Sequence, residues 1–325
     1  MGFLQKLLHY QNICIQCHNN PDPDTIASAF GIYSYLKSHN INARLIYSGP
    51  QIIEKSNLKL MIKECDINLE YTHNISRPEL LLLVDCQYAQ GNVQQFDAEN
   101  IMIIDHHIPV VALNDNYLID SSYQSCSTII WNLLLEENFP VKDYPKLVVA
   151  LLYGLYTDTA NFADLYNHAD LNMKEQLFDK QPLFDQLTKS SMSLAEFMIS
   201  TEALHNHYFD MERRFAIIDV LKCDQAVLGI IGDFIIQVDL VFLSFAYTEN
   251  NIAYQISLRS CHPQIPANAI AEYICSEIGS GGGHANKAGG RILKAKMYEK
   301  YKHENIFELA NTLICRYIDD NKITF

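Results

Sequence analysis

The stretch Ile101-Met102-Ile103-Ile104-Asp105-His106-His107 is an apolar run of strand length that ends in three polar side chains. Continuous apolar runs of this length are typical of strands in a parallel sheet covered on both faces. Two further runs have the same form, because Ile13–Cys17 ends at His18 and Leu80–Val84 ends at Asp85. In an open α/β sheet the carboxyl ends of the strands face one crevice, where ligands bind. We therefore expect these polar residues to converge.

The first 160 residues alternate strand-like and helix-like stretches. Apolar residues recur at helical spacing in Thr25–His39, which predicts an amphipathic helix that Asp22 or Asp24 caps. Ala43–Tyr47 is another strand candidate, and the further helix candidates are Ser127–Glu137 and Tyr144–Leu155. This alternation predicts an α/β domain with a parallel sheet.

The second half of the chain has a different pattern. Residues 175–207 are polar and helical, which predicts a connecting segment. Shorter strand candidates and one helix candidate follow: Arg214–Val220, Leu240–Tyr247, Ile252–Leu258 and Ala267–Ile278. We therefore predict an α/β domain over residues 1–190 and a smaller α+β domain over residues 191–325.

Composition limits the class of protein. The 325 residues are 49% hydrophobic and 19% charged, as in a globular protein. The net charge of −14 disfavours a protein that binds long duplex nucleic acid, which needs a basic stripe. No apolar run is long enough for a membrane span, and the start has no signal-peptide pattern. These features predict a cytoplasmic protein without a membrane partner.

The polar residues have the chemistry of a metal site. Asp22 and Asp24 form an Asp-x-Asp pair before a helix, and His18 lies four residues earlier. Asp85 can bridge two ions, while two further residues, His106 and Asp158, can complete the second site. Carboxylates with some imidazole favour Mn²⁺, with Mg²⁺ or Co²⁺ as alternatives. Two such ions can activate a bridging hydroxide and cleave a phosphate ester.

Two other groups of residues suit the same chemistry. His107 is a candidate general acid or stabiliser of the transition state, and Asp105 can orient a histidine from behind. Far downstream, the glycines of Gly281-Gly282-Gly283-His284 allow backbone N–H groups to approach an anion, and His284 adds a donor. Arg259 offers a planar fork that suits a phosphate.

The order of these motifs resembles the DHH phosphoesterase superfamily, named for its Asp-His-His triplet. The match includes His18-x-x-x-Asp22-x-Asp24, the apolar run before Asp85, the triplet itself and Thr157-Asp158-Thr159. Ser257-Leu258-Arg259-Ser260 and the glycine run through Gly290 resemble the DHH-associated C-terminal domain. The motifs span residues 18 to 290, most of the chain.

The resemblance implies an Mn²⁺-dependent enzyme with its active site in a cleft between the domains, and frequently a dimer. It implies that His18, Asp22 and Asp85 hold one metal ion. The implied ligands of the other are Asp24, Asp85, His106 and Asp158. The most similar group degrades short oligoribonucleotides, 3′-phosphoadenosine 5′-phosphate, or linear and cyclic dinucleotides. Cleavage inside a chain, at its end or in a ring is left open.

The chain departs from the family pattern in its basic residues. Related sequences tend to have an arginine between Asp85 and Gly91, where this chain has none, and often a basic residue after Thr-Asp-Thr. Arg44 and Arg77 are the only arginines before residue 191. A non-catalytic nucleotide sensor therefore remains an alternative. An inorganic pyrophosphatase is another, although the run Gly281–His284 argues against it.

Overall fold

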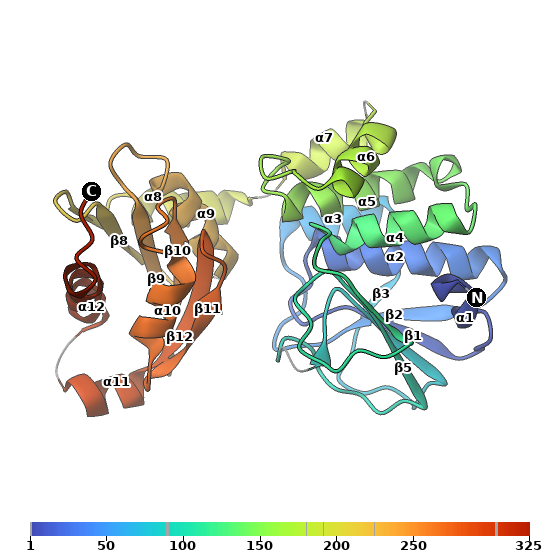
Figure 1. Cartoon of the computed structure of the whole chain (residues 1–325), viewed down its shortest axis with the longest axis horizontal. Coiled ribbons are helices and arrows are strands. Elements are labelled where there is room, and N and C mark those ends of the chain that lie inside the picture. Colours follow the sequence, from blue (N-terminus) through green and yellow to red (C-terminus); the bar gives the residue numbers. More distant parts are fainter. Residues whose placement is uncertain (1, 89–90, 180, 191, 224, 303–304) are drawn as a thin grey trace. The chain divides into compact units, whose positions relative to one another are not determined.

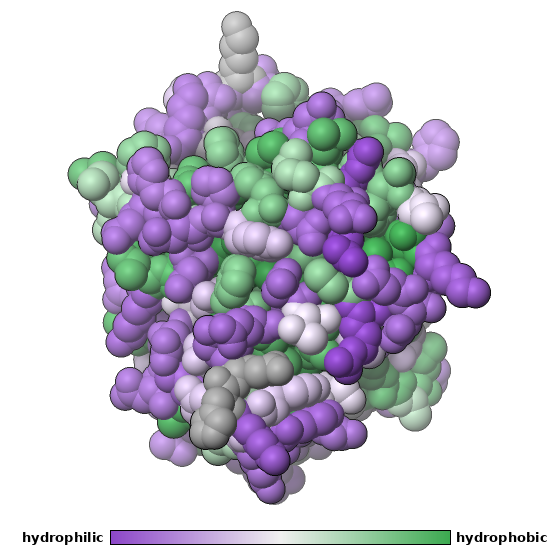
Figure 2. Space-filling view, turned by 90° about the vertical axis from the view of Figure 1, so that its left-hand side faces the viewer, coloured by the Kyte–Doolittle hydropathy of each residue, from purple (hydrophilic) through white to green (hydrophobic). Residues whose placement is uncertain are grey.

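The computed structural model describes residues 2–88, 91–179, 181–190, 192–223, 225–302 and 305–325, and Figure 1 shows the chain. The chain divides into two compact units, Met1–Met192 and Ser193–Phe325. On the face drawn in Figure 2, hydrophilic residues predominate and hydrophobic residues lie in small groups between them. None of the helices in the described ranges combines the length and the apolar character that crossing a bilayer requires.

Six strands of the described first unit form one sheet in which every neighbouring pair is parallel. In spatial order they are β3 (Leu69–Tyr71), β2 (Ala43–Tyr47), β1 (Ile13–Gln16), β4 (Leu80–Val84), β5 (Asn100–Asp105) and β6 (Tyr117–Ile119). All five residues of β4 are buried, as expected for a central parallel strand. The predicted α/β fold with a parallel sheet is therefore confirmed.

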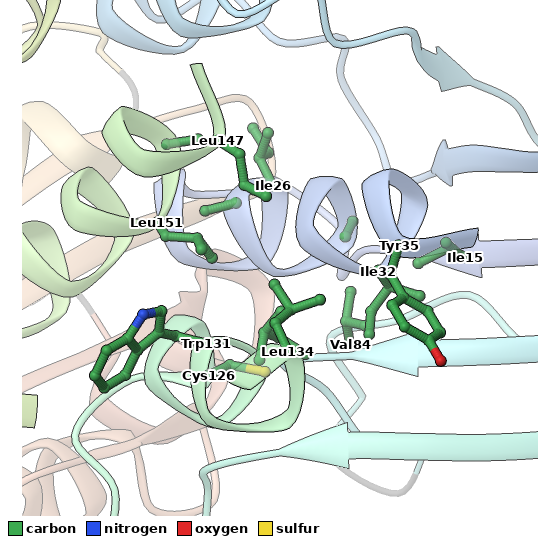
Figure 3. Packing of buried hydrophobic residues seen from close by; sticks show 14 of the residues in the cluster. Ile15, Ile26, Ile32, Tyr35, Val84, Cys126, Trp131, Leu134, Leu147 and Leu151 are labelled. Atoms are coloured by element: carbon green, nitrogen blue, oxygen red, sulfur yellow. The ribbon is translucent and has the colours of Figure 1, made fainter. Parts of the chain in front are cut away.

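Three helices pack side by side on one face of this sheet: α2 (Pro23–Ser38), α4 (Cys126–Glu136) and α5 (Pro145–Asp158) (Figure 1). Figure 3 shows how Ile26 and Ile32 of α2 meet Leu134 of α4 and Leu151 of α5 above the sheet residue Val84. The shorter helices of the unit are α1 (Phe3–Leu7), α3 (Ser56–Glu64), α6 (His168–Leu177), α7 (Pro182–Thr188) and the 3₁₀ turn η2 (Val141–Asp143).

The opposite face of the sheet is covered differently. Tyr88, Val93 and Phe96, from the connection between β4 and β5, pack there against strand residues such as Leu81 and Leu83. The sheet is thus buried on both sides, as its apolar strands predict. Because all its strands are parallel, their carboxyl ends lie along one edge, and this edge carries His18, Asp85 and Asp105.

The second unit contains a mixed sheet. Its described strands, in spatial order, are β11 (Gly279–Gly283), β12 (Lys287–Leu293), β10 (Ala253–Ser260), β9 (Leu243–Glu249), β8 (Phe215–Val220) and β7 (His207–Asp210). Only the β8–β9 pair is parallel among these. The predicted smaller α+β domain is confirmed.

Helices cover both faces of the mixed sheet. On one face, α10 (Ala267–Cys275) and α12 (Ile306–Asp320) share a core with the even-numbered residues of β10. On the other, α8 (Leu194–Ala203) and α9 (Gln225–Ile235) pack on β8 and β9. One more helix, α11 (Lys294–Tyr301), follows β12 directly. The segment predicted as a helical connection, residues 175–207, thus includes α8, which belongs to the second unit, and its last residue begins β7.

Candidate metal centre

The carboxyl edge of the parallel sheet brings the six predicted metal ligands together. Three groups there have ligand atoms within 4.8 Å of one another. They are His18 with Asp22 and Asp85; Asp24 with His106 and Asp158; and Asp85 with His106 and His107. The first two groups correspond to the two predicted sites, and together they include every residue predicted as a ligand.

Asp85 lies between these groups. It follows β4 with a left-handed backbone, φ 59°, and its N–H donates to the carbonyl of Ile104 at 2.8 Å. Such a conformation is uncommon for a residue other than glycine and is often found at functional sites. The side chain is buried, with Oδ2 3.6 Å from Nε2 of His18 and Oδ1 3.3 Å from Nε2 of His106. Oδ2 of Asp85 thus faces the group with His18, and Oδ1 faces the group with His106.

The first group is held by local hydrogen bonds. Nδ1 of His18 lies 2.9 Å from the carbonyl of Asn19, so Nδ1 carries the proton and Nε2 faces the carboxylates. Asp22 is the N-cap of α2, where Oδ1 accepts from the N–H of Thr25 at 3.0 Å. Its Oδ2 lies 3.6 Å from Nε2 of His18. The helix cap therefore orients one oxygen and leaves the other for a ligand.

The second group depends on helix packing. Asp24 is fully buried in the first turn of α2, and its carboxylate accepts N–H bonds of 2.7 Å from Cys126 and 2.9 Å from Ser127 at the start of α4. An ionised carboxylate has about four lone-pair sites, so it can still hold a metal. Asp158, at the end of α5, places Oδ2 3.3 Å from Nε2 of His106.

The packing of α5 against Asp24 requires a glycine. A Cβ at Gly154 would lie 2.3 Å from Oγ of Ser127 and 2.9 Å from Oδ1 of Asp24. Sequence analysis did not identify Gly154. A lone glycine inside a helical pattern is the signal that could have drawn attention to it, since such a glycine often has a packing reason.

His107 is oriented from behind by Asp105. Oδ1 of the fully buried Asp105 lies 2.7 Å from Nδ1 of His107, and its Oδ2 accepts from Nε2 of Gln87 at 2.7 Å. Gln87 also accepts the N–H of Val110 at 2.8 Å, which fixes the loop after the triplet. The His107 side chain is 38% exposed, against 12% for His106, so it can meet a substrate. Sequence analysis did not find Gln87, although it lies only two residues after Asp85.

The buried carboxylates of the site shift the pKa values of their neighbours. Burial alone would lower the pKa of His18, but the carboxylates of Asp22 and Asp85 raise it well above its usual value. The pKa of His106 is raised in the same way, against burial, by Asp158 and Asp85. Burial, assisted by Asp158 and Asp85, raises the pKa of Asp24 well above its usual value. These shifts show that the carboxylates create a strongly negative potential, which favours positive charge at the site.

Two buried atoms support a metal in this place. Oδ1 of Asp85 and Nε2 of His106 are 3.3 Å apart, yet neither makes a well-directed hydrogen bond to any described residue. Buried polar atoms are normally satisfied, and a cation between them would satisfy both. The donor set of four carboxylates and two imidazoles suits a hard divalent ion such as Mn²⁺ or Mg²⁺.

The residues predicted to grip a phosphate lie in the second unit. Nε of Arg259 is 2.5 Å from Oδ1 of Asp233, and Nη1 donates to Oγ of Ser257 and the carbonyl of Leu258, each at 3.0 Å. No hydrogen bond from Nη2 to a described residue is present. Nη2 lies against α9, where a Cβ at Gly229 would come within 2.7 Å of it. The guanidinium is therefore held in one orientation, and its binding of a phosphate stays a prediction.

The glycine run forms the edge strand β11, where alternate N–H groups point away from β12. A Cβ at Gly281 would lie 2.6 Å from the carbonyl of Ala271, so this glycine lets α10 approach. Gly283 has φ 142°, and a Cβ there would lie 2.7 Å from the carbonyl of Lys287. The N–H of the exposed His284 donates to that same carbonyl at 2.7 Å. Packing explains two of the glycines, and phosphate binding by the run stays a prediction.

Residues 12–155 match the DHH family, N-terminal domain. The uncharacterized protein MG371 of Mycoplasma genitalium is 24% identical over 164 residues, which are 50% of this chain and 49% of that protein. The match thus spans about half the length of this relative. A solved structure, an exopolyphosphatase-related protein from Bacteroides fragilis, has a TM-score of 0.75 at 18% identity. The match covers 99% of this chain and 98% of the chain in that structure, so the two proteins share a fold over both units.

Proposed function

We propose that this protein is a metal-dependent enzyme that cleaves phosphate esters of short nucleotides, because residues 12–155 match the N-terminal domain of the DHH family, whose members are phosphohydrolases. The observation that carries the proposal is the carboxylate of Asp85, which turns one oxygen toward His18 and the other toward His106. A shared carboxylate between two ligand groups is the arrangement that a two-metal site needs.

Two ions would be held by the groups already described. His18, Asp22 and Asp85 would hold one ion, and Asp24, Asp85, His106 and Asp158 the other. We propose Mn²⁺, with Mg²⁺ or Co²⁺ as substitutes, because the donors are oxygen and imidazole. Such a pair supplies a water molecule of lowered pKa and positive charge for the phosphoryl oxygens.

His107 has the properties of a general acid. Burial lowers its pKa, but Asp105 and Asp85 reverse this and raise it above the usual value, which favours the protonated form that a general acid needs. Nδ1–H is held by Asp105, which leaves the proton on Nε2 as the transferable one. We propose that this proton goes to the leaving oxygen. Asp105 and Gln87 keep the ring in place for that transfer.

Short nucleotides fit the charge of the protein better than long nucleic acids do. The net charge of −14 opposes binding of an extended polyanion, except where cations are locally concentrated. Arg259, whose guanidinium is held in one orientation by Asp233 and Ser257, is the proposed phosphate ligand. The proposed substrates are oligoribonucleotides, dinucleotides and 3′-phosphoadenosine 5′-phosphate.

A substrate panel tests the proposal. The protein with Mn²⁺ is incubated with a ribodinucleotide, a tetraribonucleotide, 3′-phosphoadenosine 5′-phosphate and pyrophosphate, beside the Asp85→Asn variant. We expect release of mononucleotides or phosphate from at least one nucleotide, and none with the variant. Turnover of pyrophosphate alone would replace the proposal with a pyrophosphatase. Tight nucleotide binding without product over hours, with metal bound, would replace it with a sensor.

A further inference from the structure

One face of β12 in the second unit is rich in cations. The side chains of Ala288 and Ile292 point toward α10 and are buried, so Lys287, Gly289 and Arg291 point to the opposite face. In the strand pairing, Lys287 lies opposite Arg259 of β10. Directly paired residues share a face, so Arg259, Lys287 and Arg291 lie on the same side of the sheet. We call these three residues the basic strip.

The basic strip lies only partly under a helix. Helix α9 packs on β9 and β10, where Gly229 and Gly232 approach the side chain of Arg259 so closely that a Cβ would come within 2.7 and 3.1 Å of it. At β12, Gln225 at the start of α9 lies beside Gly289, where a Cβ would come within 2.6 Å of its Nε2. Lys287 and Arg291 are exposed. A ligand can therefore reach the strip within the second unit.

The charges of the strip are available for an anion. Neither Lys287 nor Arg291 has an ion pair with any described residue, and Arg259 uses only Nε for Asp233. The other positions on this face of β10 to β12 hold no acid; they are Ala253, Gln255, Ser257, Ser280, Gly282, Gly289 and Leu293. On the β11 side, the carboxylate of Glu272 comes within 3.9 Å of a Cβ at Gly282 and marks the end of the strip.

The spacing of the strip decides what it can bind. Lys287 and Arg291 are four residues apart on one strand, which places their Cα atoms about 13 Å apart at roughly 3.3 Å per residue. A single nucleotide is too short to bridge that distance, whereas a chain of several nucleotides can. Serine and glycine between the cations let a sugar–phosphate backbone approach the strands. Contacts to the backbone bind nucleic acid without reading its sequence.

We propose that the basic strip binds the sugar–phosphate backbone of oligonucleotides longer than a dinucleotide, and that Arg291 sets the preference for such substrates. The inference rests on the proposed function, because it assigns a length preference to the same enzyme. Arg259 takes the phosphate that every substrate has. Arg291 takes a phosphate that only a longer chain can present.

The test compares Arg291→Gln with Arg316→Gln. Arg316 is an exposed arginine of α12, the helix on the opposite face of the sheet, and it too has no ion pair with a described residue. Both changes remove the same charge from the same unit. Affinity for a fluorescent tetraribonucleotide and a diribonucleotide is measured by anisotropy over a range of salt concentrations, and KM and kcat are measured for both.

We expect Arg291→Gln to weaken tetranucleotide binding and to raise the KM for the tetranucleotide, each about fivefold. This factor is the upper end of what an exposed ion pair contributes to affinity. The slope of log affinity against log salt should fall by about 0.7, the value for one phosphate contact to a single strand. Dinucleotide binding and kcat should not change, and Arg291→Lys should restore the slope. Arg316→Gln should leave all these quantities as in the unmodified protein.

The outcomes separate the two proposals. An equal loss for both substrates, or equal effects of Arg291→Gln and Arg316→Gln, would overturn the basic strip while turnover still supports the enzyme. Binding of the tetranucleotide that depends on Arg291, without turnover of either substrate, would support the strip and overturn the proposed function. Equal affinity of the unmodified protein for both lengths would also overturn the strip.

Discussion

Replacing Gly154 with alanine should damage the metal site through packing alone. The new methyl group would lie 2.3 Å from Oγ of Ser127 and 2.9 Å from Oδ1 of Asp24, so one of them must move. Both residues belong to the hydrogen-bonded junction of α2 and α4. Displacing a residue that orients ligands typically costs 10–100-fold in metal affinity or activity, and we expect about that loss in Mn²⁺ affinity.

The same change has a smaller effect on stability. Alanine in place of glycine favours a helix by about 1 kcal/mol, while overpacking costs about 1–3 kcal/mol. The net loss of about 1 kcal/mol should lower the melting temperature of the first unit by about 2–4 °C. Gly31→Ala is the matched control, since its Cβ would lie 2.5 Å from Cγ2 of Ile130 and touches no ligand.

The two variants are compared by calorimetric titration with Mn²⁺ and by thermal unfolding in EDTA. Both should melt earlier, but only Gly154→Ala should lose metal affinity. If Gly154→Ala binds Mn²⁺ as tightly as Gly31→Ala does, the junction does not position Asp24 as described. If both variants lose Mn²⁺ affinity equally, the loss comes from general destabilisation of the unit, and a specific role of Gly154 at the metal site is refuted.

Three further predictions follow from the site. Asp85→Ala should abolish Mn²⁺-dependent turnover and reduce the metal content measured by mass spectrometry; near-normal turnover would show that Asp85 is not the shared ligand. Gln87→Leu removes a buried donor to Asp105 and should lower kcat about 10–100-fold, with Mn²⁺ affinity in titrations nearly unchanged; an unchanged kcat would contradict its role. Folding raises the pKa values of His18 and His106, so the folded chain without metal binds more protons than the unfolded chain. Their stabilisation is complete below about pH 6.5 and is lost as pH rises through the folded pKa, so the melting temperature in EDTA should fall over that range. With Mn²⁺ in place of the protons it should rise, and a rise in EDTA would refute the argument.

Much of the fold could be predicted because the hydrophobic pattern of each segment agrees with its place in the folded protein. The run Leu80–Val84 was predicted as a strand and is one with the same bounds, because burial on both faces demands apolar residues throughout. Thr25–His39 was predicted as a helix, and the observed helix is Pro23–Ser38 with Asp22 as its cap. Helix α9, with Gly229 and Gly232 inside it, was not predicted, since glycine weakens the helical signal.

The site could be predicted only in part. His18, Asp85 and His106 follow apolar strands, so topology alone places them on one edge. Gln87 carries no motif, and its role depends on a loop that folds back to Asp105. Gly281–Gly283 form a paired edge strand, and packing against α10 explains part of this glycine content without any ligand. The predicted phosphate grip stays a prediction. The ion pair of Arg259 with Asp233 joins residues 26 positions apart and has no sequence signal.

The most direct measurement is anomalous X-ray scattering from crystals of the protein grown with Mn²⁺. We expect two peaks, one on either side of the Asp85 carboxylate. One should lie beside His18 and Asp22, and the other beside His106 and Asp158. A single peak, or manganese bound away from Asp85, would contradict the two-metal site.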